Sequence, residues 1–433
     1  MSLPQIDHTH KPSATSWVAS ANGHSDFPVQ NLPFGVFSRA GGARQLGVAI
    51  GDSILDLAGA ARARLLPGVN ASQLTGSSLN TLMAAPPSQR LALRHAVFDV
   101  LTNDQHRAHA TPHLMPAEAC DLHLPAAIGD YTDFYVGIHH ARNVGAQFRP
   151  DNPLLPNYKY VPIGYHGRAS SIRPSGVPLV RPKGQRKAPD GDTPIVGPST
   201  RLDYEVELGI WIGQGNALGE PIPIADAGRH ITGFCLLNDW SARDFQAWEY
   251  QPLGPFLAKN FQSTISPWII TAEALAPFRI AQPARPAGDP APLPYLFDLA
   301  DQAGGALAIT LSARISTAKM REAGQPPHRL SGGPASNMYW TPAQIVTHHA
   351  SNGCNLNPGD LLGTGTISAP TADGYGSLLE ISNGGKTPIT LPSGEARTFL
   401  EDGDEILLTA TAQAEGFVSI GFGECRAIVL PAI

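Results

Sequence analysis

Two residues that can do chemistry stand seven positions apart in the segment IGDYTDFYVGIHHARNVGAQFR, residues 128–149. Asp133 offers oxygen ligands for a hard cation, and His140 offers an imidazole that titrates near neutral pH. Helical residues seven apart lie two turns along and roughly in line, so the spacing predicts one helical face on which Asp133 and His140 converge with Tyr135. The alternative is an ordinary surface or core histidine, and the local sequence does not distinguish His139 from His140.

Two more carboxylates alternate with apolar residues in the run DYEVELGIWI, residues 203–212. Side chains alternate between the faces of a strand, so Glu205 and Glu207 share one face. One interpretation is a half-exposed strand with a solvated acidic face. The other is a cation site, because two carboxylates ~7 Å apart repel by roughly 2 kcal/mol at an effective dielectric near 20. The apolar character of the rest of this strand favours the cation site.

A third polar group follows the apolar run FCLL. Asp239 stands at the end of this predicted buried strand, and Ser241 is a candidate N-cap for a helix. On that helix Arg243, Gln246 and Tyr250 fall at i, i+3 and i+7. One face would therefore carry a cation, an amide and a phenol, although a solvated face is the plainer alternative.

Other single residues complete the set of candidates. Lys259 follows apolar residues and is a buried or cleft lysine, or one that extends to solvent. Thr366 and Glu380, within GTIS and GSLLE, offer a hydroxyl and a carboxylate. We interpret the doublet His348-His349 as structural, because adjacent side chains point apart in a strand or helix.

The four acidic candidates share a chemistry. An all-oxygen, strongly acidic site suits calcium or magnesium better than zinc. The predicted ligands are Asp133, Glu205, Glu207 and Asp239.

The composition limits the class of protein. With 433 residues the chain exceeds the usual single core, which predicts two domains. Its net charge of -6 and pI near 6.2 argue against a nucleic-acid partner. No apolar run approaches the length of a membrane span, and the start MSLPQIDHTH lacks a basic segment followed by a hydrophobic one. We therefore expect a cytoplasmic protein without a membrane partner.

The elements that must position these residues are short strands. The 44 glycines and 40 prolines, in a chain that is 42% hydrophobic, indicate a loop-rich, mainly β (α+β) globular protein. Strands are predicted at 34–37, 45–50, 53–55, 204–212, 231–237, 268–270, 307–315, 360–367, 378–381 and 405–411. A helix with Ser88 as its N-cap is expected through Val100. The stretches 181–194 and 276–294 are predicted to be the least structured. The four cysteines form no Cys-x-x-Cys pair, which favours reduced thiols.

Several long segments resemble one enzyme family. These segments are IGDYTDFY, GYHGRASS, NDWSARDFQAWEY, PLGPFLAKNF, THHASNGCNLNPGDLLGTGTIS and DGDE. They are similar to the fumarylacetoacetase family, whose reaction is hydrolysis of 4-fumarylacetoacetate, a small diketo acid, to fumarate and acetoacetate in tyrosine and phenylalanine breakdown. The resemblance implies an N-terminal SH3-like barrel at 1–120, a C-terminal mixed β-roll at 121–433, and a homodimer.

The resemblance also implies roles for named residues. The calcium ligands would be the four carboxylates above, and magnesium would lie near Asp239, Lys259 and Ser263. His140 would be the general base, oriented by Glu380. Charge-stabilising residues would be Arg243, Gln246 and Lys259, and substrate-binding residues would be Tyr135, Arg149, Tyr165, Gln246, Tyr250 and Thr366.

Two rival functions remain at this point. An acylpyruvase, or a dioate decarboxylase or isomerase of the same superfamily, would share the Glu-x-Glu and Asp ligands, but such enzymes generally lack the full N-terminal domain. A calcium-stabilised binding protein without turnover would leave His140 and Arg243 unexplained.

Overall fold

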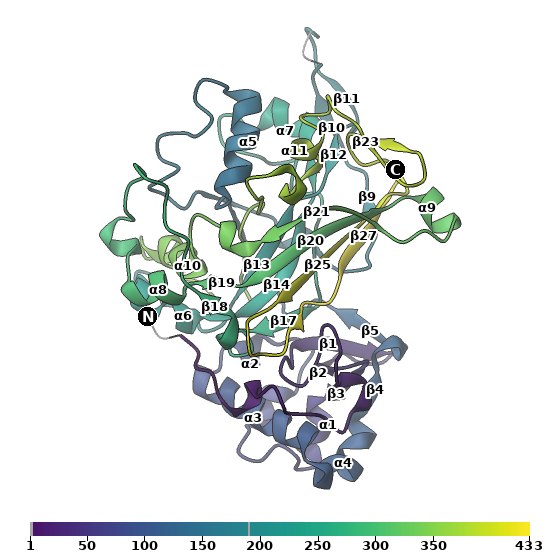
Figure 1. Cartoon of the computed structure of the whole chain (residues 1–433), viewed down its shortest axis with the longest axis vertical. Coiled ribbons are helices and arrows are strands. Elements are labelled where there is room, and N and C mark those ends of the chain that lie inside the picture. Colours follow the sequence, from purple (N-terminus) through teal and green to yellow (C-terminus); the bar gives the residue numbers. More distant parts are fainter. Residues whose placement is uncertain (1–2, 189–190) are drawn as a thin grey trace.

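The computed structural model describes residues 3–188 and 191–433 and has a smaller and a larger part (Figure 1). The smaller part, at the bottom of the view, holds the N-terminal strands and helices. Its strands are β1 (Phe34–Arg39), β2 (Gln45–Ile50), β3 (Ser53–Asp56), β4 (Leu114–Pro116) and β5 (Cys120–His123). Its helices are α1 (Leu57–Arg62), α2 (Asn80–Met83), α3 (Pro87–Thr102) and α4 (Asp104–Ala110).

The predicted strands of the smaller part are confirmed. Gly51 turns the chain between β2 and β3 with φ +54°, a conformation that glycine adopts without steric cost. The predicted cap of α3 is wrong: the helix is preceded by Pro86 and has Pro87 at its first position, so Ser88 already lies inside it. Proline fits there because its missing N–H would have no partner within the helix.

One large sheet runs through both parts. Among the described residues its main path is β4-β3-β2-β1-β17-β14-β13-β22-β6-β7, with β5, β16 and β8 attached at the sides. The new strands are β6 (Tyr131–Phe134), β7 (Gly164–His166), β8 (Ile172–Pro174), β13 (Val206–Ile212), β14 (Ile231–Asp239), β16 (Ser263–Ile265), β17 (Trp268–Thr271) and β22 (Leu361–Gly363). The antiparallel pair β1–β17 joins the two parts, with Phe34 opposite Ile269.

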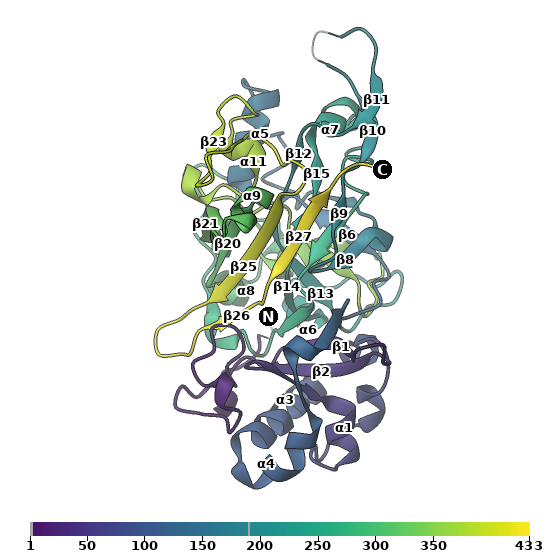
Figure 2. The ribbon, with the colours of Figure 1, turned by 90° about the vertical axis from the view of Figure 1, so that its right-hand side faces the viewer.

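A second sheet packs over the first. Its order is β21-β20-β25-β27-β9, with β26 on β25. The strands are β9 (Leu179–Val180), β20 (Ile309–Ser316), β21 (His328–Pro334), β25 (Glu405–Ala412), β26 (Ile420–Gly421) and β27 (Cys425–Leu430). In Figure 2 the long strands β25 and β27 lie in front of β13 and β14. Leu208 of β13 and Leu311 of β20 belong to the same buried apolar cluster, so the main core lies between the sheets.

The remaining elements are short. Two-stranded pairs are β10 (Lys183–Arg186) with β11 (Ile195–Pro198), β12 (Leu202–Asp203) with β15 (Ser241–Ala242), β18 (Arg279–Ile280) with β19 (Ala306–Leu307), and β23 (Ile389–Thr390) with β24 (Ala396–Arg397). Helices are α5 (Ile138–Phe148), α6 (Ile224–His230), α7 (Arg243–Glu249), α8 (Leu299–Gly304), α9 (Ala318–Glu322), α10 (Pro342–Ala350) and α11 (Leu378–Ile381).

Three predictions for the larger part need correction. Residues 378–381 form the helix α11, not a strand. The strand expected over 360–367 is limited to Leu361–Gly363, because the chain leaves the sheet at Gly365 with φ +75°. The stretch 181–194 contains β10, which pairs with β11, and residues 189–190 lie outside the described residues. The other predicted strands are confirmed to within a few residues.

The fold class is mainly sheet with helices, as predicted. The SH3-like barrel is not confirmed: among the described residues β5 pairs with β1, and β4 pairs with β3, without a β4–β5 pair that would close a ring. Within those residues, no helix combines the length and the apolar character that crossing a bilayer requires.

Candidate active site

Asp133 and His140 do not share a helix. Asp133 lies on β6, opposite Gly363 of β22 and Tyr165 of β7, whereas His140 lies in the first turn of α5. Gly137 precedes that helix, and a Cβ there would come within 2.0 Å of the Thr366 carbonyl oxygen. The strand therefore turns at a crowded point before the helix begins, and the predicted single helical face is wrong.

Three of the four predicted cation ligands form a buried group. Carboxylate oxygens of Asp133, Glu207 and Asp239 all lie within 4.8 Å of one another. Their exposures are 3%, 0% and 1%. They come from β14 and β13, which are neighbours, and from β6, which β22 separates from β13. Their burial excludes the alternative of a solvated acidic face on β13.

Electrostatics in this group favours a cation. Burial, followed by the charge of Asp239, raises the pKa of Asp133 well above its usual range. Burial and then the charge of Asp133 do the same to the pKa of Glu207. Asp133 Oδ1 and Glu207 Oε1 are buried and have no hydrogen-bond partner among the described residues. Unpaired buried carboxylate oxygens are costly, and a bound cation would satisfy them.

The backbone leaves room beside these oxygens. A Cβ built on Gly363 would lie 2.6 Å from Asp133 Oδ1 and 3.1 Å from Glu207 Oε2. Any side chain at this position would fill the space between the two carboxylates. The residues present therefore fit a hard divalent cation, because the ligands are oxygen atoms and Gly363 leaves space beside them.

Glu205 lies beside this group but is paired with cations. Arg243 Nη1 is 2.8 Å from Glu205 Oε1, and Lys259 Nζ donates to Glu205 Oε2. Although burial raises the pKa of Glu205, the charges of Lys259 and Arg243 lower it below its usual range. The Glu205 carboxylate is therefore ionised, and it holds the side chains of Arg243 and Lys259 at the site.

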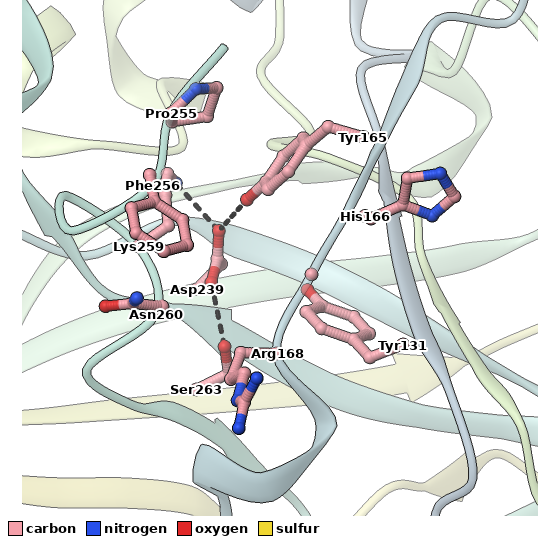
Figure 3. A pocket seen from close by; sticks show the side chains of 11 residues that line it. Tyr131, Tyr165, His166, Arg168, Asp239, Pro255, Phe256, Lys259, Asn260 and Ser263 are labelled. Carbon is pink, nitrogen blue, oxygen red and sulfur yellow. Dashed lines mark hydrogen bonds and ion pairs between the residues drawn. The ribbon is translucent and has the colours of Figure 1, made fainter. Parts of the chain in front are cut away.

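Asp239 lines a pocket of about 110 Å³ together with Tyr165, Lys259 and Ser263 (Figure 3). Figure 3 shows Asp239 at the centre of three contacts. Its Oδ2 is 2.8 Å from Lys259 Nζ and accepts a hydrogen bond from the Tyr165 hydroxyl at 3.2 Å. Its Oδ1 accepts from Ser263 Oγ at 2.8 Å. The three residues expected near magnesium thus meet here.

His140 and Glu380 form a buried pair. His140 Nδ1 lies 2.7 Å from Glu380 Oε2. A carboxylate only accepts, so Nδ1 carries the hydrogen, and the neutral form of this ring has its lone pair on Nε2. Nε2 is on the side of the carboxylate cluster, 3.8 Å from Glu205 Oε1. Burial raises the pKa of Glu380, but His140 and the other hydrogen bonds lower it below its usual value. Glu380 is therefore ionised and sets the tautomer of His140.

Helix α7 presents only part of its predicted face to this cluster. Arg243 Nη1 donates to Gln246 Oε1 at 3.1 Å, and Arg243 Nη2 is buried without a partner among the described residues. Tyr250 is half-buried just after the helix. The predicted cap is wrong: Ala242 precedes α7, and Ser241 instead donates to the Asp239 carbonyl at 3.1 Å.

The other predicted substrate residues lie around the pair. The Tyr135 ring meets His140 edge-on, with centroids 5.7 Å apart. Arg149 is the C-cap residue of α5. Burial raises the pKa of Tyr135, and the positive charge of Arg149 acts in the opposite direction. Thr366 is buried in the loop after β22, where a Cβ on Gly376 would lie 2.6 Å from its Cγ2.

Three residues that were not predicted hold Glu380 in place. Asn143 Nδ2 donates to Glu380 Oε1 at 2.8 Å, and Ser368 and Ser377 donate to Oε2 at 2.8 and 2.9 Å. Two patterns would have found Asn143 and Ser377. Asn143 is three residues after His140 on one helix, and Ser377-x-x-Glu380 is the sequence of a helix N-terminal capping box.

Asp203, also missed, connects the two halves of the site. It is fully buried, and its Oδ2 accepts from Arg243 Nε at 2.9 Å. The backbone N–H groups of Leu378 and Leu379, at the start of α11, donate to the same carboxylate at 2.8 and 3.0 Å. Asp203 thereby fixes Arg243 relative to the helix that carries Glu380.

Asp203→Ala is expected to lower the free energy of unfolding by about 3–5 kcal/mol, because it leaves the buried Nε of Arg243 and the backbone N–H groups of Leu378 and Leu379 without their acceptor. Urea denaturation measures this loss. The control is Asp226→Ala, which breaks the exposed pair with Arg229 and should change stability by less than about 1 kcal/mol. An Asp203 variant as stable as this control would contradict the connecting role.

The predictions for the other histidines and the cysteines are confirmed. On α10, His348 Nδ1 contacts the Tyr295 hydroxyl at 2.9 Å, and His349 Nε2 contacts Thr132 Oγ1 at 2.9 Å, so the two rings point to different neighbours. All four cysteines are free.

Comparison with known proteins covers almost the whole chain. The family description "Fumarylacetoacetase N-terminal" matches residues 30–125, and "Fumarylacetoacetate (FAA) hydrolase C-terminal" matches residues 131–430. The fumarylacetoacetase of Caenorhabditis elegans is 46% identical over 419 residues, covering 94% of this chain and 97% of that protein. The fumarylacetoacetase of Homo sapiens is 45% identical over 418 residues, with the same coverage of 94% and 97%.

A solved structure shares the fold. The fumarylacetoacetate hydrolase from psychrophilic Exiguobacterium antarcticum superposes with a TM-score of 0.51 at 18% identity, covering 92% of this chain and 99% of that one.

Proposed function

We propose, because the chain belongs to the fumarylacetoacetase family, that it hydrolyses the carbon–carbon bond of 4-fumarylacetoacetate to fumarate and acetoacetate, a step of tyrosine catabolism. The observation that carries this proposal is the His140–Glu380 pair, whose free imidazole nitrogen lies beside Glu205 and its two cations.

His140 is placed to act as the general base. Hydrolysis begins when water attacks the ketone carbon of the fumaryl group, and the water must lose a proton as the new carbon–oxygen bond forms. Nε2 of His140 accepts that proton. Glu380 keeps the ring in the required tautomer and stabilises the imidazolium that results.

Arg243, Lys259 and Gln246 act on the charge that develops later. When the carbon–carbon bond breaks, its electron pair passes to the acetoacetate fragment as an enolate. Arg243 Nη2, which has no hydrogen-bond partner among residues 3–188 and 191–433, is a buried donor available to an oxygen of that fragment. Lys259 adds a second positive charge, and proton transfer to the enolate carbon completes acetoacetate.

We propose calcium as the cation held by Asp133, Glu205, Glu207 and Asp239, and magnesium as a second ion near Asp239, Lys259 and Ser263. The orphaned oxygens of Asp133 and Glu207 and the space beside Gly363 support the first ion. When bound, such a cation would chelate the 1,3-dicarbonyl and lower the free-energy cost of the enolate as a Lewis acid.

The test is turnover by the purified protein. With calcium present, it should convert 4-fumarylacetoacetate to equal amounts of fumarate and acetoacetate, measured by chromatography. Acylpyruvates assayed in parallel separate this function from its superfamily rivals. Faster turnover of an acylpyruvate, or no turnover of any of these compounds, would overturn the proposal.

Arg243→Met is expected to lower kcat by a larger factor than it raises KM, because negative charge reaches the substrate oxygens only as bonds change. Steady-state kinetics on protein of confirmed fold gives the two values. A variant with unchanged kcat and only a raised KM would instead assign Arg243 to simple substrate binding.

We propose a homodimer as well. Large apolar side chains are exposed on the hairpin β10–β11 and on the segment after α7, including Val196 (75%), Leu253 (96%) and Phe256 (66%). The hairpin contacts α7, the helix that this segment follows, with Trp248 Nε1 donating to Gln185 Oε1 at 3.2 Å. Exposed large apolar side chains on neighbouring elements are typical of a subunit interface. The SH3-like barrel at 1–120, the catalytic domain at 121–433 and the cytoplasmic location stay predictions.

A further inference from the structure

A second group of ligand-type side chains lies in the smaller part of the molecule, apart from the acidic group. One nitrogen or oxygen atom from each of Asp7, His8 and His95 lies within 4.8 Å of the others. Asp7 and His8 belong to the N-terminal segment, and His95 lies on α3. The group therefore forms where this segment, purple in Figure 1, passes α3.

The local backbone fixes Asp7. It is the N-cap of a short 3-10 helix, His8–His10, and its Oδ1 accepts hydrogen bonds from the Thr9 backbone N–H at 2.8 Å and the Thr9 hydroxyl at 2.7 Å. The Asp7 N–H in turn donates to His10 Nδ1 at 3.0 Å. His10 Nε2 is 2.9 Å from the Glu273 carbonyl oxygen, so both nitrogens of His10 have structural partners.

The other oxygen of Asp7 faces the two remaining imidazoles. Asp7 Oδ2 lies 2.7 Å from His95 Nε2. The His8 ring packs on His95 with centroids 4.5 Å apart, and its edge contacts Phe98 at 5.6 Å between centroids. His8 is exposed, whereas Asp7 and His95 are half-buried, so a small ion can reach the group from solvent.

We propose that Asp7, His8 and His95 bind a transition-metal ion of the zinc class. Two imidazoles and one carboxylate are ligands that zinc takes in proteins, and water would complete a tetrahedron. Ligands about 2.0–2.1 Å from zinc stand roughly 3.3 Å apart, so the Asp7–His95 contact must widen slightly. This mixed nitrogen and oxygen set differs from the all-oxygen group at the active site, which favours a hard cation.

The bound ion would join the N-terminal segment to α3. The segment already contacts this helix through Arg94, whose Nε donates to Thr9 Oγ1 at 2.9 Å. An ion that binds the folded protein and not the unfolded chain raises stability with its concentration. The site therefore predicts stabilisation by zinc that is independent of turnover.

Thermal unfolding with added zinc chloride tests the proposal. The full-length protein is stripped with EDTA, and excess calcium is added so that hard-cation sites are filled. The wild type should then bind one more equivalent of zinc than the His8→Ala variant does. Zinc should raise the wild-type Tm by about 3 °C or more. His8→Ala should abolish that rise while leaving the metal-free Tm within about 1 °C, because His8 is exposed.

The matched control is His106→Ala. His106 also pairs with a carboxylate, because its Nε2 lies 3.0 Å from Asp99 Oδ2. Among the described residues, no third histidine, cysteine or carboxylate completes a metal-binding group with this pair. This variant should keep the zinc response. His95→Gln, checked for fold by circular dichroism, should lose it. If His8→Ala binds zinc and gains stability like the wild type, or if His106→Ala loses the response equally, the site does not exist.

Discussion

Replacing His140 by alanine is expected to lower kcat by ~10²- to 10⁴-fold or more, while His139→Ala should stay close to the wild type. The two histidines are neighbours on α5, yet only His140 has Nδ1 on Glu380 and Nε2 near Glu205. His139 is half-buried, and burial followed by the charge of Arg142 lowers its pKa. It has neither the orienting carboxylate nor the position of a base.

Both variants should be assayed with saturating calcium and after their fold has been checked by circular dichroism. Glu380→Gln is the natural companion, because it keeps the size of the side chain but removes the charge that supports the imidazolium. It should slow turnover with little change in KM. An inactive His139→Ala beside an active His140→Ala would mean that the base has been assigned to the wrong ring.

Several of the site residues were predictable from local patterns. Alternation in one strand puts Glu205 and Glu207 on one face, and the end of an apolar run marks Asp239. The seven-residue spacing grouped Asp133 with His140, but for the wrong reason, because the two lie on a strand and a helix. Aromatic and β-branched residues around Asp133 favour a strand, and Gly137 interrupts the pattern.

The assembly of the site was not predictable from local patterns. The partner of His140 is 240 residues away in sequence, and β6 meets β22 through a parallel pairing between Asp133 and Gly363. Such pairings depend on the whole sheet, which periodicity does not report. The four-residue helix α11 is also too short for a periodic signal, so its apolar residues suggested a strand.

Substituting glutamine for Glu207 or for Glu205 should separate two kinds of carboxylate in one cluster. Either change is expected to lower activity by ~10³-fold or more. Each removes a charge near the reacting atoms and so raises the activation free energy by several kcal/mol. Their effects on the free energy of unfolding of the cation-free protein should have opposite signs. Glu207 faces like charges, whereas Glu205 is paired with Arg243 and Lys259.

Without added cations, Glu207→Gln should therefore raise the free energy of unfolding by about 1–2 kcal/mol, since it removes a repelling charge and its amide oxygen can still accept from the Gly365 N–H. Because burial and Asp133 raise the folded-state pKa of Glu207, the contribution of this carboxyl group to wild-type stability falls as pH rises, and the gain should grow with pH. Glu205→Gln should instead lose about 3–5 kcal/mol, because it removes the charge that lies between two buried cations, which Asp239 and Asp203 then balance only in part. Urea denaturation of the EDTA-treated proteins at two pH values measures the stability of both variants.

Adding calcium should stabilise the wild type more than Glu207→Gln. If the cation-free Glu207 variant is destabilised as much as the Glu205 variant, the carboxylates do not repel, and the case for a cation between them fails.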